Sequence, residues 1–426
     1  MEVKSDRKYR PRAVDDEVER YLNTFGAVCV EGPKWCGKTW TSAHHSASAF
    51  YIGDPASNFQ NRRLAEMSPS AVLEGESPRL LDEWQEVPSL WDAMRYEVDR
   101  RAERGQFILT GSSTPVRKGI LHSGAGRIGK LRMRTMSLFE SGDSSGKVSL
   151  KDICDGKFTS VLTGDVDLRD LARYVVRGGW PGNIDVAPEN AGLLPESYIN
   201  AILDDDVQRI DNVKYDIRKM RMLLRSLARN ESTTATNKKL LDDIKEYDDE
   251  NIDGNTLAVY LDVLNRLFLL DNQLPYSVNI RSSVRIKQSE KRHFCDPSLA
   301  CALLKATPEK LIGDLNTFGF MFEGLCERDL KVYAQAFGGS LFHYQDYKNR
   351  EIDAVIDLDG RWCAFEIKLG ANQIDEAAAA LVKIKDDLLK DGGIAPSVLC
   401  VICGLSNAAY MRSDGVYVVP VTALRP

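Results

Sequence analysis

Short apolar runs separated by longer mixed stretches organise the first quarter of the chain. Four of these runs have the length of buried strands, at residues 27–31, 49–52, 79–81 and 107–109. An amphipathic pattern over residues 14–22 predicts a short helix before the first run, which ends at Gly32. The stretches between the runs are long enough for helices. This alternation predicts a parallel α/β sheet covered by helices.

A helical period replaces this pattern from residue 167 to about residue 270, where apolar residues recur at spacings of three and four. Residues 237–244 and 256–268 fit a helix, a turn and a second helix. Residues 278–294 then alternate like a β-hairpin. This order predicts winged-helix topology.

The last third returns to strand-like runs, at residues 341–344, 351–358, 362–367 and 397–402. An alanine-rich helix is expected over residues 375–389, between the last two runs. These elements predict a second α/β unit. The chain shows no internal repeat, heptad array or low-complexity tract.

The chain has 426 residues, more than one hydrophobic core usually organises, so two or three domains are expected. Its 43% hydrophobic and 28% charged residues are ordinary for a globular protein. The net charge of −6 excludes a protein that is basic overall, although a local basic face can still bind a polyanion. No stretch approaches the roughly 18 apolar residues of a membrane span, so we expect no membrane partner.

Nine cysteines are scattered without a regular framework. Cys400 and Cys403 form one CxxC, but it lies in an apolar run typical of a strand, not in the exposed turn of a redox or zinc site. We therefore expect core thiols and a cytoplasmic location, where thiols stay reduced.

Candidate chemistry begins where the first apolar run ends. Residues 32–39 match GxxxxGK[ST] between a predicted strand and a polar helix, the context that a phosphate-binding P-loop requires. Backbone N–H groups and a helix N-terminus hold phosphate oxygens in such a loop, and the alternative is a chance glycine turn. We expect Lys38 to reach the β and γ phosphates of ATP, and the Thr39 hydroxyl to bind Mg²⁺. The expected nucleotide contacts are Gly32, Pro33, Lys34, Trp35, Cys36, Gly37, Lys38, Thr39 and Trp40.

Two acids follow the third run, in Leu80-Leu81-Asp82-Glu83, which has the form of a Walker B element. Asp82 is expected to hold Mg²⁺ through water, and Glu83 to orient or deprotonate the attacking water. The fourth run delivers hydroxyls at its carboxyl end, where ligands of open α/β sheets bind, and Ser112 is a candidate sensor of the γ phosphate. The alternatives are a solvated acid pair and hydroxyls that merely cap a loop.

Between Arg117 and Arg134 the chain carries six Arg and Lys residues and no acid. This stretch fits a solvated basic loop, a nucleic-acid surface, or an arginine finger. In the last case Arg127 stabilises transition-state charge in its own or a neighbouring subunit.

Charged residues interrupt two strand candidates near the carboxyl terminus. Asp353 opens an apolar run, and Glu366 and Lys368 lie two apart on the next run, so they share one strand face. This D…ExK arrangement is similar to that of PD-(D/E)XK nucleases, in which acids hold Mg²⁺ and the lysine positions water or stabilises charge. Glu323, in the helical stretch 320–330, would add a helix-borne carboxylate. Ion-paired strand residues without catalysis are the open alternative.

The predicted hairpin carries Arg281, Arg285, Lys287, Lys291 and Arg292. These residues suit phosphate contacts, which would make binding salt-dependent. Acids crowd the preceding helix and turn, at Asp242, Asp243, Asp248, Asp249 and Glu250. A protein-contact or lid role is therefore an equal alternative to DNA binding.

Several of these motifs together resemble one family, the prokaryotic AAA+ ATPases with a nuclease-like carboxyl-terminal domain of unassigned function. The motifs are residues 32–39, 80–85 and 110–112, Gly126-Arg127, the turn Gly178-Gly179-Trp180-Pro181, and Asp353 with Glu366-x-Lys368. The resemblance implies an AAA+ P-loop ATPase domain over 1–160, a helical lid and winged-helix-like region over 161–295, and a PD-(D/E)XK-like domain over 296–426. It supplies no substrate. Trp35-Cys36 departs from the smaller residues usual in such loops.

The main hypothesis is an ATP-hydrolysing AAA+ protein, with ATP and Mg²⁺ as cofactors. Its nucleotide state repositions a carboxyl-terminal half that handles nucleic acid, with DNA favoured and the choice between DNA and RNA left open. One alternative is a regulatory switch that retains ATP, binds a protein partner and uses the later domains as scaffolds. Another is an ATP-gated, metal-dependent nuclease. An oligomer is compatible with each of these hypotheses, and no acceptor signature indicates a kinase.

Overall fold

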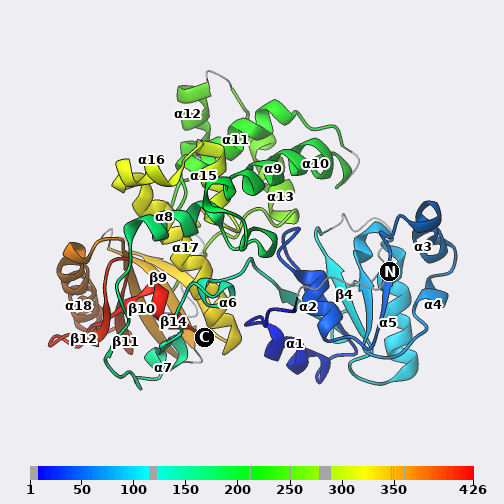
Figure 1. The fold of residues 1–426 in the computed structure, drawn as a ribbon, viewed down its shortest axis with the longest axis horizontal. Coiled ribbons are helices and arrows are strands. Elements are labelled where there is room, and N and C mark those ends of the chain that lie inside the picture. The colour runs from blue at the N-terminus through cyan, green and yellow to red at the C-terminus, as the bar shows by residue number, and fades with distance from the viewer. Residues whose placement is uncertain are drawn as a thin grey trace. The chain divides into compact units, whose positions relative to one another are not determined.

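The computed structural model describes residues 8–114, 122–210, 213–248, 251–277, 289–346, 348, 350–358 and 360–426. They form two compact units, each with its own large sheet (Figure 1). Unit 1 comprises Met1–Thr135, Asp206–Lys214 and Val263–Leu269. Unit 2 comprises Met136–Asp205, Tyr215–Asp262 and Leu270–Pro426. The domain boundaries that the sequence places near residues 160 and 295 stay predictions.

Five parallel strands form the sheet of unit 1, in the order β2-β3-β4-β1-β5. The strands are β1 (Ala27–Glu31), β2 (Ser48–Tyr51), β3 (Arg79–Asp82), β4 (Phe107–Gly111) and β5 (Ile128–Arg132). The helices are α1 (Asp15–Leu22), α2 (Lys38–His44), α3 (Ala56–Met67), α4 (Pro69–Val72), α5 (Ser89–Arg101) and α10 (Val207–Arg209), with a 3₁₀ turn η1 (Trp84–Glu86). The parallel α/β sheet expected from the sequence is confirmed.

Side chains alternate between the two faces of this sheet along each strand, and a hydrophobic cluster covers each face. On one face Cys29 of β1 packs in a cluster with Met94 of α5. On the other face Val28 packs in a cluster with Val18 of α1. Strands β1 and β4 are therefore almost wholly buried, whereas β2 at the side of the sheet is only partly buried. The carboxyl ends of the strands lead into the loops that follow β1, β3 and β4.

Seven strands form the sheet of unit 2, in the order β7-β12-β13-β11-β10-β9-β8. Strands β8, β9 and β10 are antiparallel neighbours, whereas β10, β11 and β13 run parallel. The strands are β7 (Val161–Leu162), β8 (Ser340–Gln345), β9 (Glu351–Leu358), β10 (Arg361–Lys368), β11 (Val398–Cys403), β12 (Ala408–Met411) and β13 (Tyr417–Pro420). A separate pair joins β6 (Val148–Ser149) to β14 (Leu424–Arg425). The predicted second α/β unit is confirmed.

Helix α18 (Ile374–Lys390) connects β10 to the parallel strand β11, and its Ala377 and Leu381 pack against Trp362 and Val401 of the sheet. Figure 1 shows α18 on one side of this sheet and α17 (Leu315–Ala336) on the other. Helix α17 packs against β8 and β10. These two helices account for the burial of β9, β10 and β11.

Helices dominate the middle of the chain, as the spacing of apolar residues predicts. They are α6 (Leu138–Ser141), α7 (Leu150–Cys154), α8 (Leu168–Arg177), α9 (Leu193–Ala201), α11 (Ile217–Arg229), α12 (Asn237–Asp248), α13 (Gly254–Arg266), α15 (Pro297–Leu304) and α16 (Pro308–Gly313). Shorter turns are η2 (Pro181–Asn183), η3 (Pro188–Asn190), η5 (Ala371–Gln373) and η6 (Val421–Ala423), with a π-type turn η4 (Ile202–Asp206). Helix α13 begins in unit 2, and its last residues from Val263 belong to unit 1.

Most of the predicted hairpin, including Arg281, Arg285 and Lys287, lies outside the described residues. The part that is described is strand-like, because Lys291 and Gln273 exchange backbone hydrogen bonds of 2.9 and 3.0 Å. Winged-helix topology therefore stays a prediction.

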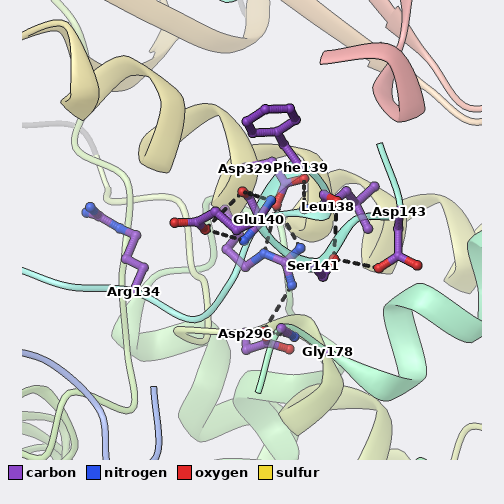
Figure 2. A network of polar contacts seen from close by, with 12 residues as sticks. Arg134, Leu138, Phe139, Glu140, Ser141, Asp143, Gly178, Asp296 and Asp329 are labelled. Carbon is purple, nitrogen blue, oxygen red and sulfur yellow. Dashed lines mark hydrogen bonds and ion pairs between the residues drawn. The ribbon is translucent and has the colours of Figure 1, made fainter. Parts of the chain in front are cut away.

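A buried polar network in unit 2 joins α17 to two turns far away in the sequence (Figure 2). The Arg328 guanidinium donates to Asp329 at 2.7 Å and to Asp296 at 3.0 Å. Asp329 accepts the Leu138 amide at the start of α6 (3.0 Å), and Asp296 accepts the Gly179 amide (2.9 Å). The network fixes the Gly178-Gly179-Trp180-Pro181 turn that the sequence singled out.

This turn needs its glycines for steric reasons. Gly178 has φ of +70°, in the left-handed region, and a Cβ on Gly179 would lie 2.0 Å from the Met136 carbonyl oxygen. That carbonyl belongs to backbone, which a side-chain rotation does not clear. The turn is thus a packing requirement of unit 2.

All nine cysteines are buried and unbridged, as the sequence predicts for core thiols. Within the described ranges, no helix combines the length and the apolar character needed to cross a bilayer.

Candidate functional site

The glycine-rich loop runs from the end of β1 to the start of α2, as the sequence predicts. A Cβ on Gly32 would lie 2.1 Å from the Met133 carbonyl oxygen, so the chain passes this point only without a side chain. Gly37 caps α2 with φ of +106°, a conformation open to glycine and costly for other residues. Both glycines of the motif are therefore set by backbone geometry.

The two unusual loop residues point in different directions. Trp35 has φ of +62° and a side chain that is 57% exposed. Cys36 is fully buried in the cluster that contains Val28 and Val30, with Sγ 3.9 Å from the Met133 carbonyl oxygen. Arg12, which the sequence did not single out, donates to the Cys36 carbonyl at 2.8 Å. It stabilises the loop from a position 24 residues away, and no sequence signal marks it.

Lys38 is buried at the start of α2, and its ammonium donates to the Pro33 carbonyl of the loop at 2.8 Å. The side chain thus folds back over the loop in which phosphate oxygens would lie. Trp40, two residues further on, is 42% exposed.

Asp82, at the end of β3, accepts hydrogen bonds from two hydroxyls. Thr39 donates to Oδ1 at 2.8 Å, and Thr110 at the end of β4 donates to the same oxygen at 2.7 Å. Burial raises the pKa of Asp82, and these two hydrogen bonds oppose the increase without cancelling it. A buried carboxylate beside a threonine hydroxyl is a set of hard oxygen donors, which fits Mg²⁺.

Glu83 is held by the neighbouring strand. Its amide donates to Thr110 at 2.9 Å, and Ser112 donates its hydroxyl proton to Glu83 Oε2 at 2.7 Å. Gln85 donates to the same carboxylate and, at 3.1 Å, to Ser112. Glu83 itself has φ of +58°, a strained conformation for a side-chain-bearing residue.

Gln85 is a site residue that the sequence analysis did not assign a role. Its Oε1 is buried and has no hydrogen-bond partner in the part of the chain that the structure describes. An acceptor in that state costs free energy unless a ligand or water satisfies it. The sequence places hydroxyls at the carboxyl end of the apolar run that forms β4, and Thr110 and Ser112 lie there. The role of Ser112 as a sensor of the γ phosphate stays a prediction.

Arg127 lies at the amino ends of the strands, opposite the ends that carry the P-loop and the Walker acids. Its carbonyl accepts the amide of Ala27 at 3.1 Å, and Ala27 is the first residue of β1. Because β1 and β5 are parallel, Arg127 is about 16 Å along the strand direction from the P-loop edge. Its guanidinium donates to Asp99 at 2.9 Å. The structure does not bring Arg127 to the Walker residues of its own chain, so only the role on a neighbouring subunit stays a prediction.

Two later segments of the chain belong to unit 1 and contact the nucleotide loops. Asp206 forms an ion pair with Lys34 of the P-loop. Arg266, at the end of α13, donates to the Thr114 carbonyl at 3.1 Å, and its own carbonyl accepts the Thr114 amide at 2.9 Å. Thr114 lies two residues after Ser112. Sequence analysis missed these contacts because more than 150 residues separate the partners.

A second charged group lies in unit 2, on β9 and β10. Lys368 contacts Asp353 at 3.1 Å and Glu366 at 2.7 Å. The Ile367 amide also donates to Asp353, at 2.8 Å. The three residues that the D…ExK pattern names therefore converge.

Glu323 and Glu327, one turn apart on α17, join this group through Lys291. The Lys291 ammonium pairs with Glu323, lies 2.9 Å from Glu327 and lies 3.9 Å from Asp353. His293 pairs with the other oxygen of Glu327. The sequence assigned Lys291 to phosphate contacts; the structure instead buries it among carboxylates, which is a correction.

Burial and charge act in opposite directions on these groups. Burial raises the pKa of Glu323 to about 8, and burial together with the Asp353 charge raises the pKa of Glu366 to about 8. Burial also works to raise the pKa of Asp353, but Lys291 and Lys368 hold it below its usual value. Across the described residues, no three acid, histidine or cysteine side chains form a set that could hold a metal ion. The predicted ligands Glu323, Asp353 and Glu366 are close together, with ammonium groups between them.

Comparison with known protein families divides the chain into three parts. Residues 24–141 match the AAA domain, residues 168–310 match the domain of unknown function DUF8612, and residues 318–424 match the domain of unknown function DUF4143. The AAA match spans the P-loop, both Walker acids and β4.

Two relatives are the uncharacterized proteins Mb2031c of Mycobacterium bovis and Rv2008c of Mycobacterium tuberculosis. Each is 24% identical over 354 residues, which is 82% of this chain and 72% of the relative.

Among solved structures, the chain is similar to the Walker-type ATPase PABY2304 of Pyrococcus abyssi, with 11% identity and a TM-score of 0.38. That likeness covers 70% of this chain and 99% of the other. Cdc6p of Pyrobaculum aerophilum shows 12% identity and a TM-score of 0.21, over 72% and 97% of the two chains. Both scores are too low to carry a conclusion about function. The family match and the loop geometry together indicate a P-loop ATPase domain of the AAA type within residues 24–141.

Proposed function

We propose that the protein hydrolyses ATP at the P-loop of unit 1 and that the nucleotide state repositions the later segments of the chain. One observation carries this proposal: Thr39 and Thr110 donate to the Asp82 carboxylate, and Ser112 donates to the Glu83 carboxylate, at the carboxyl ends of the strands. Two acids with separate partners suit two separate tasks.

Nucleotide binding requires one rearrangement of the loop. Lys38 would leave the Pro33 carbonyl and turn its ammonium toward the β and γ phosphates. Thr39 and Asp82 would hold Mg²⁺, which supplies positive charge to the phosphate oxygens. The increase that burial causes in the pKa of Asp82 supports this role, because a buried carboxylate gains most from a nearby cation.

Glu83 would orient or deprotonate the attacking water. Ser112 and Gln85 hold one carboxylate oxygen, Oε2, and thereby limit the directions in which the other oxygen can point. The partnerless Gln85 Oε1 offers a second acceptor for that water. Positioned acid–base groups of this kind contribute roughly 10²- to 10⁴-fold to a reaction rate.

The coupling part of the proposal is supported by the contacts of Asp206 and Arg266. Asp206 pairs with Lys34 in the loop that holds phosphate, and Arg266 binds the backbone two residues after Ser112. A change at either loop would therefore act on residues 206–214 and 263–269. Both segments continue along the chain into unit 2.

Steady-state release of phosphate from Mg-ATP tests the proposal. The wild type should turn over, and Lys38→Ala should lose at least 100-fold, because the ammonium that neutralises the β and γ phosphates is gone. Very slow turnover with ATP retained on the wild type would instead favour the regulatory switch with a protein partner.

For the carboxyl-terminal half we propose an association with nucleic acid, with DNA as the ligand to test. The convergence of Asp353, Glu366 and Lys368 on neighbouring strands supports a nuclease-like arrangement. Gel retardation of DNA at low salt tests the association. Nicking of plasmid DNA with Mn²⁺ or Mg²⁺ that is lost in Lys368→Ala would reveal the metal-dependent nuclease. If the protein neither retards nor nicks DNA, the remaining hypothesis is a scaffold that binds a protein partner.

A further inference from the structure

We propose that Lys291 is an internal cation that occupies the carboxylate site of unit 2 and keeps divalent metal ions out of it. The inference deepens the proposal of a nuclease-like arrangement, on which it rests, and it is independent of ATP hydrolysis in unit 1. It concerns the site formed by Glu323, Glu327, Asp353 and Glu366, called here the acid cluster.

The position of the Lys291 ammonium carries the inference. It pairs with Glu323 on α17, lies 2.9 Å from Glu327 one turn later, and lies 3.9 Å from Asp353 on β9. It also donates to the Asp353 carbonyl at 3.4 Å. The Lys291 side chain is only 8% exposed and the Glu327 side chain 1%, so solvent screens these contacts little.

The backbone of Lys291 is fixed as firmly as its side chain. Its amide donates to the Gln273 carbonyl at 3.0 Å, and its carbonyl accepts the Gln273 amide at 2.9 Å. The Gln273 side chain in turn donates to the Asp353 carbonyl at 3.3 Å. The ammonium is therefore held within the cluster from a backbone that is itself fixed by an isolated β-bridge.

The charges leave no role for a metal ion in this arrangement. The Lys291 ammonium pairs with the carboxylates of Glu323, Glu327 and Asp353. The Lys368 ammonium pairs with those of Asp353 and Glu366. Each carboxylate of the cluster therefore has an ammonium partner. A divalent ion binds the same oxygens at about 2.0–2.6 Å, which would bring it close to Lys291. Two cations at that separation repel strongly in a site with little solvent.

The arrangement also explains why three predicted ligands converge without forming a metal site. Glu323, Asp353 and Glu366 contribute oxygens of the right kind, but the space between Glu323 and Asp353 holds an ammonium group. The acid cluster of unit 2 is thus paired with ammonium groups of the chain itself. In this state unit 2 acts without a metal ion.

A titration of the nucleotide-free full-length protein with Mn²⁺ tests the inference. Binding is measured as the loss of the electron paramagnetic resonance signal of the free ion. Lys291→Met removes the ammonium and keeps an unbranched stem of similar size. This variant should gain one Mn²⁺ site per chain that binds at least tenfold more tightly than any site in the wild type. Lys291→Arg retains the charge and should gain none. Adding Glu323→Gln to Lys291→Met should abolish the gained Mn²⁺ site. Any Mn²⁺ binding in unit 1 is the same in all of these variants, because none of them changes unit 1.

Two results would overturn the inference. One is a folded Lys291→Met protein that gains no Mn²⁺ site. The other is Mn²⁺ binding by the wild type that disappears in Asp353→Asn, a comparison that decides the question even where Lys291→Met does not fold. Neither measurement contains nucleic acid or ATP, so failure of the nucleic-acid proposal and failure of this one are separate results.

Discussion

Asp82 and Glu83, at the carboxyl end of β3 in unit 1, have separate roles in the proposed mechanism. Asp82 is held by Thr39 and Thr110, and Glu83 is held by Ser112 and Gln85. Since the two acids have different partners, their removal should affect different steps. Binding of Mg-ATP should depend on Asp82, and hydrolysis should depend on Glu83.

Glu83→Gln should lower ATP turnover by about 100-fold or more while leaving the Kd for Mg-ATP within a fewfold of the wild type, because an amide cannot accept the proton of the attacking water. Phosphate release and equilibrium nucleotide binding measure the two quantities. Glu86→Gln is the matched control, since Glu86 lies on the same η1 turn and pairs with Arg62 at the surface. Equal turnover in Glu83→Gln and Glu86→Gln would remove Glu83 from the mechanism.

A histidine in unit 2 should make stability depend on pH. Burial lowers the pKa of His343 to about 4, and the Lys291 charge adds to this effect, whereas Glu327 opposes it. The ordinary pKa is 6.5, so the unfolded chain binds the proton first as the pH falls. His343 thus contributes stability that is complete above about pH 6.5 and is lost as the pH falls toward 4.

Between pH 6.5 and 4 the free energy of unfolding should fall by about 3 kcal/mol more in the wild type than in His343→Gln, from about 1.4 kcal/mol for each tenfold change in proton affinity. Glutamine can keep the hydrogen bond to the Ser289 carbonyl, which His343 Nε2 makes at 3.2 Å. Denaturant unfolding at several pH values measures the difference, in which other titrating groups cancel. Parallel curves for the two proteins would contradict the buried neutral state of His343.

At the scale of elements, the turn between α8 and α9 has its closest backbone approach at Gly179. A Cβ on Gly179 would lie 2.0 Å from the Met136 carbonyl oxygen, whereas a Cβ on Gly182 has its nearest heavy atom at 4.0 Å. Overpacking against backbone costs about 3 kcal/mol or more. Gly179→Ala should therefore lower the Tm of the protein by several degrees, and Gly182→Ala, in the same turn, should leave it nearly unchanged. Equal melting of the two variants would show that the turn can shift without cost.

The elements were also the easiest features to predict from sequence, wherever runs of apolar and β-branched residues mark a strand. The strands over residues 27–31 and 351–358 have their predicted bounds. Strand β5 was missed because it lies at the sheet edge and includes Gly129, exposed Lys130 and Arg132.

Contacts between distant residues were beyond sequence reasoning for a different reason. The chemistry of Asp353, Glu366 and Lys368 is visible as a local spacing, so their convergence could be predicted. The position of Lys291 among carboxylates could not, because it depends on how a strand near residue 291 packs against α17 and β9. The same holds for Arg12, which binds a loop 24 residues away.

At the scale of the whole molecule, the account requires nucleotide state to reach residues outside the P-loop. Arg266 connects Thr114 to the end of α13, and its guanidinium also donates to the Ile210 carbonyl at 3.4 Å. Arg266→Ala should keep nucleotide binding within about twofold, since the guanidinium donates to the Thr114 and Ile210 carbonyls, which are not Walker residues. It should also abolish any nucleotide-dependent change in amide exchange at Val263–Leu269. Asn265→Ala is the control on the exposed side of the same helical turn, and a loss in both variants would mean that the helix end, and not the guanidinium, matters.

The central claim is that the state of the nucleotide at Lys38 and Glu83 changes the segments 206–214 and 263–269. Amide hydrogen exchange in Glu83→Gln, loaded with Mg-ATP and then with Mg-ADP, tests it most directly because hydrolysis does not mix the two states. The account expects at least a fewfold difference in exchange rate at both segments between ATP and ADP, and none when Lys38→Ala is added. Identical exchange with ATP and ADP would contradict it.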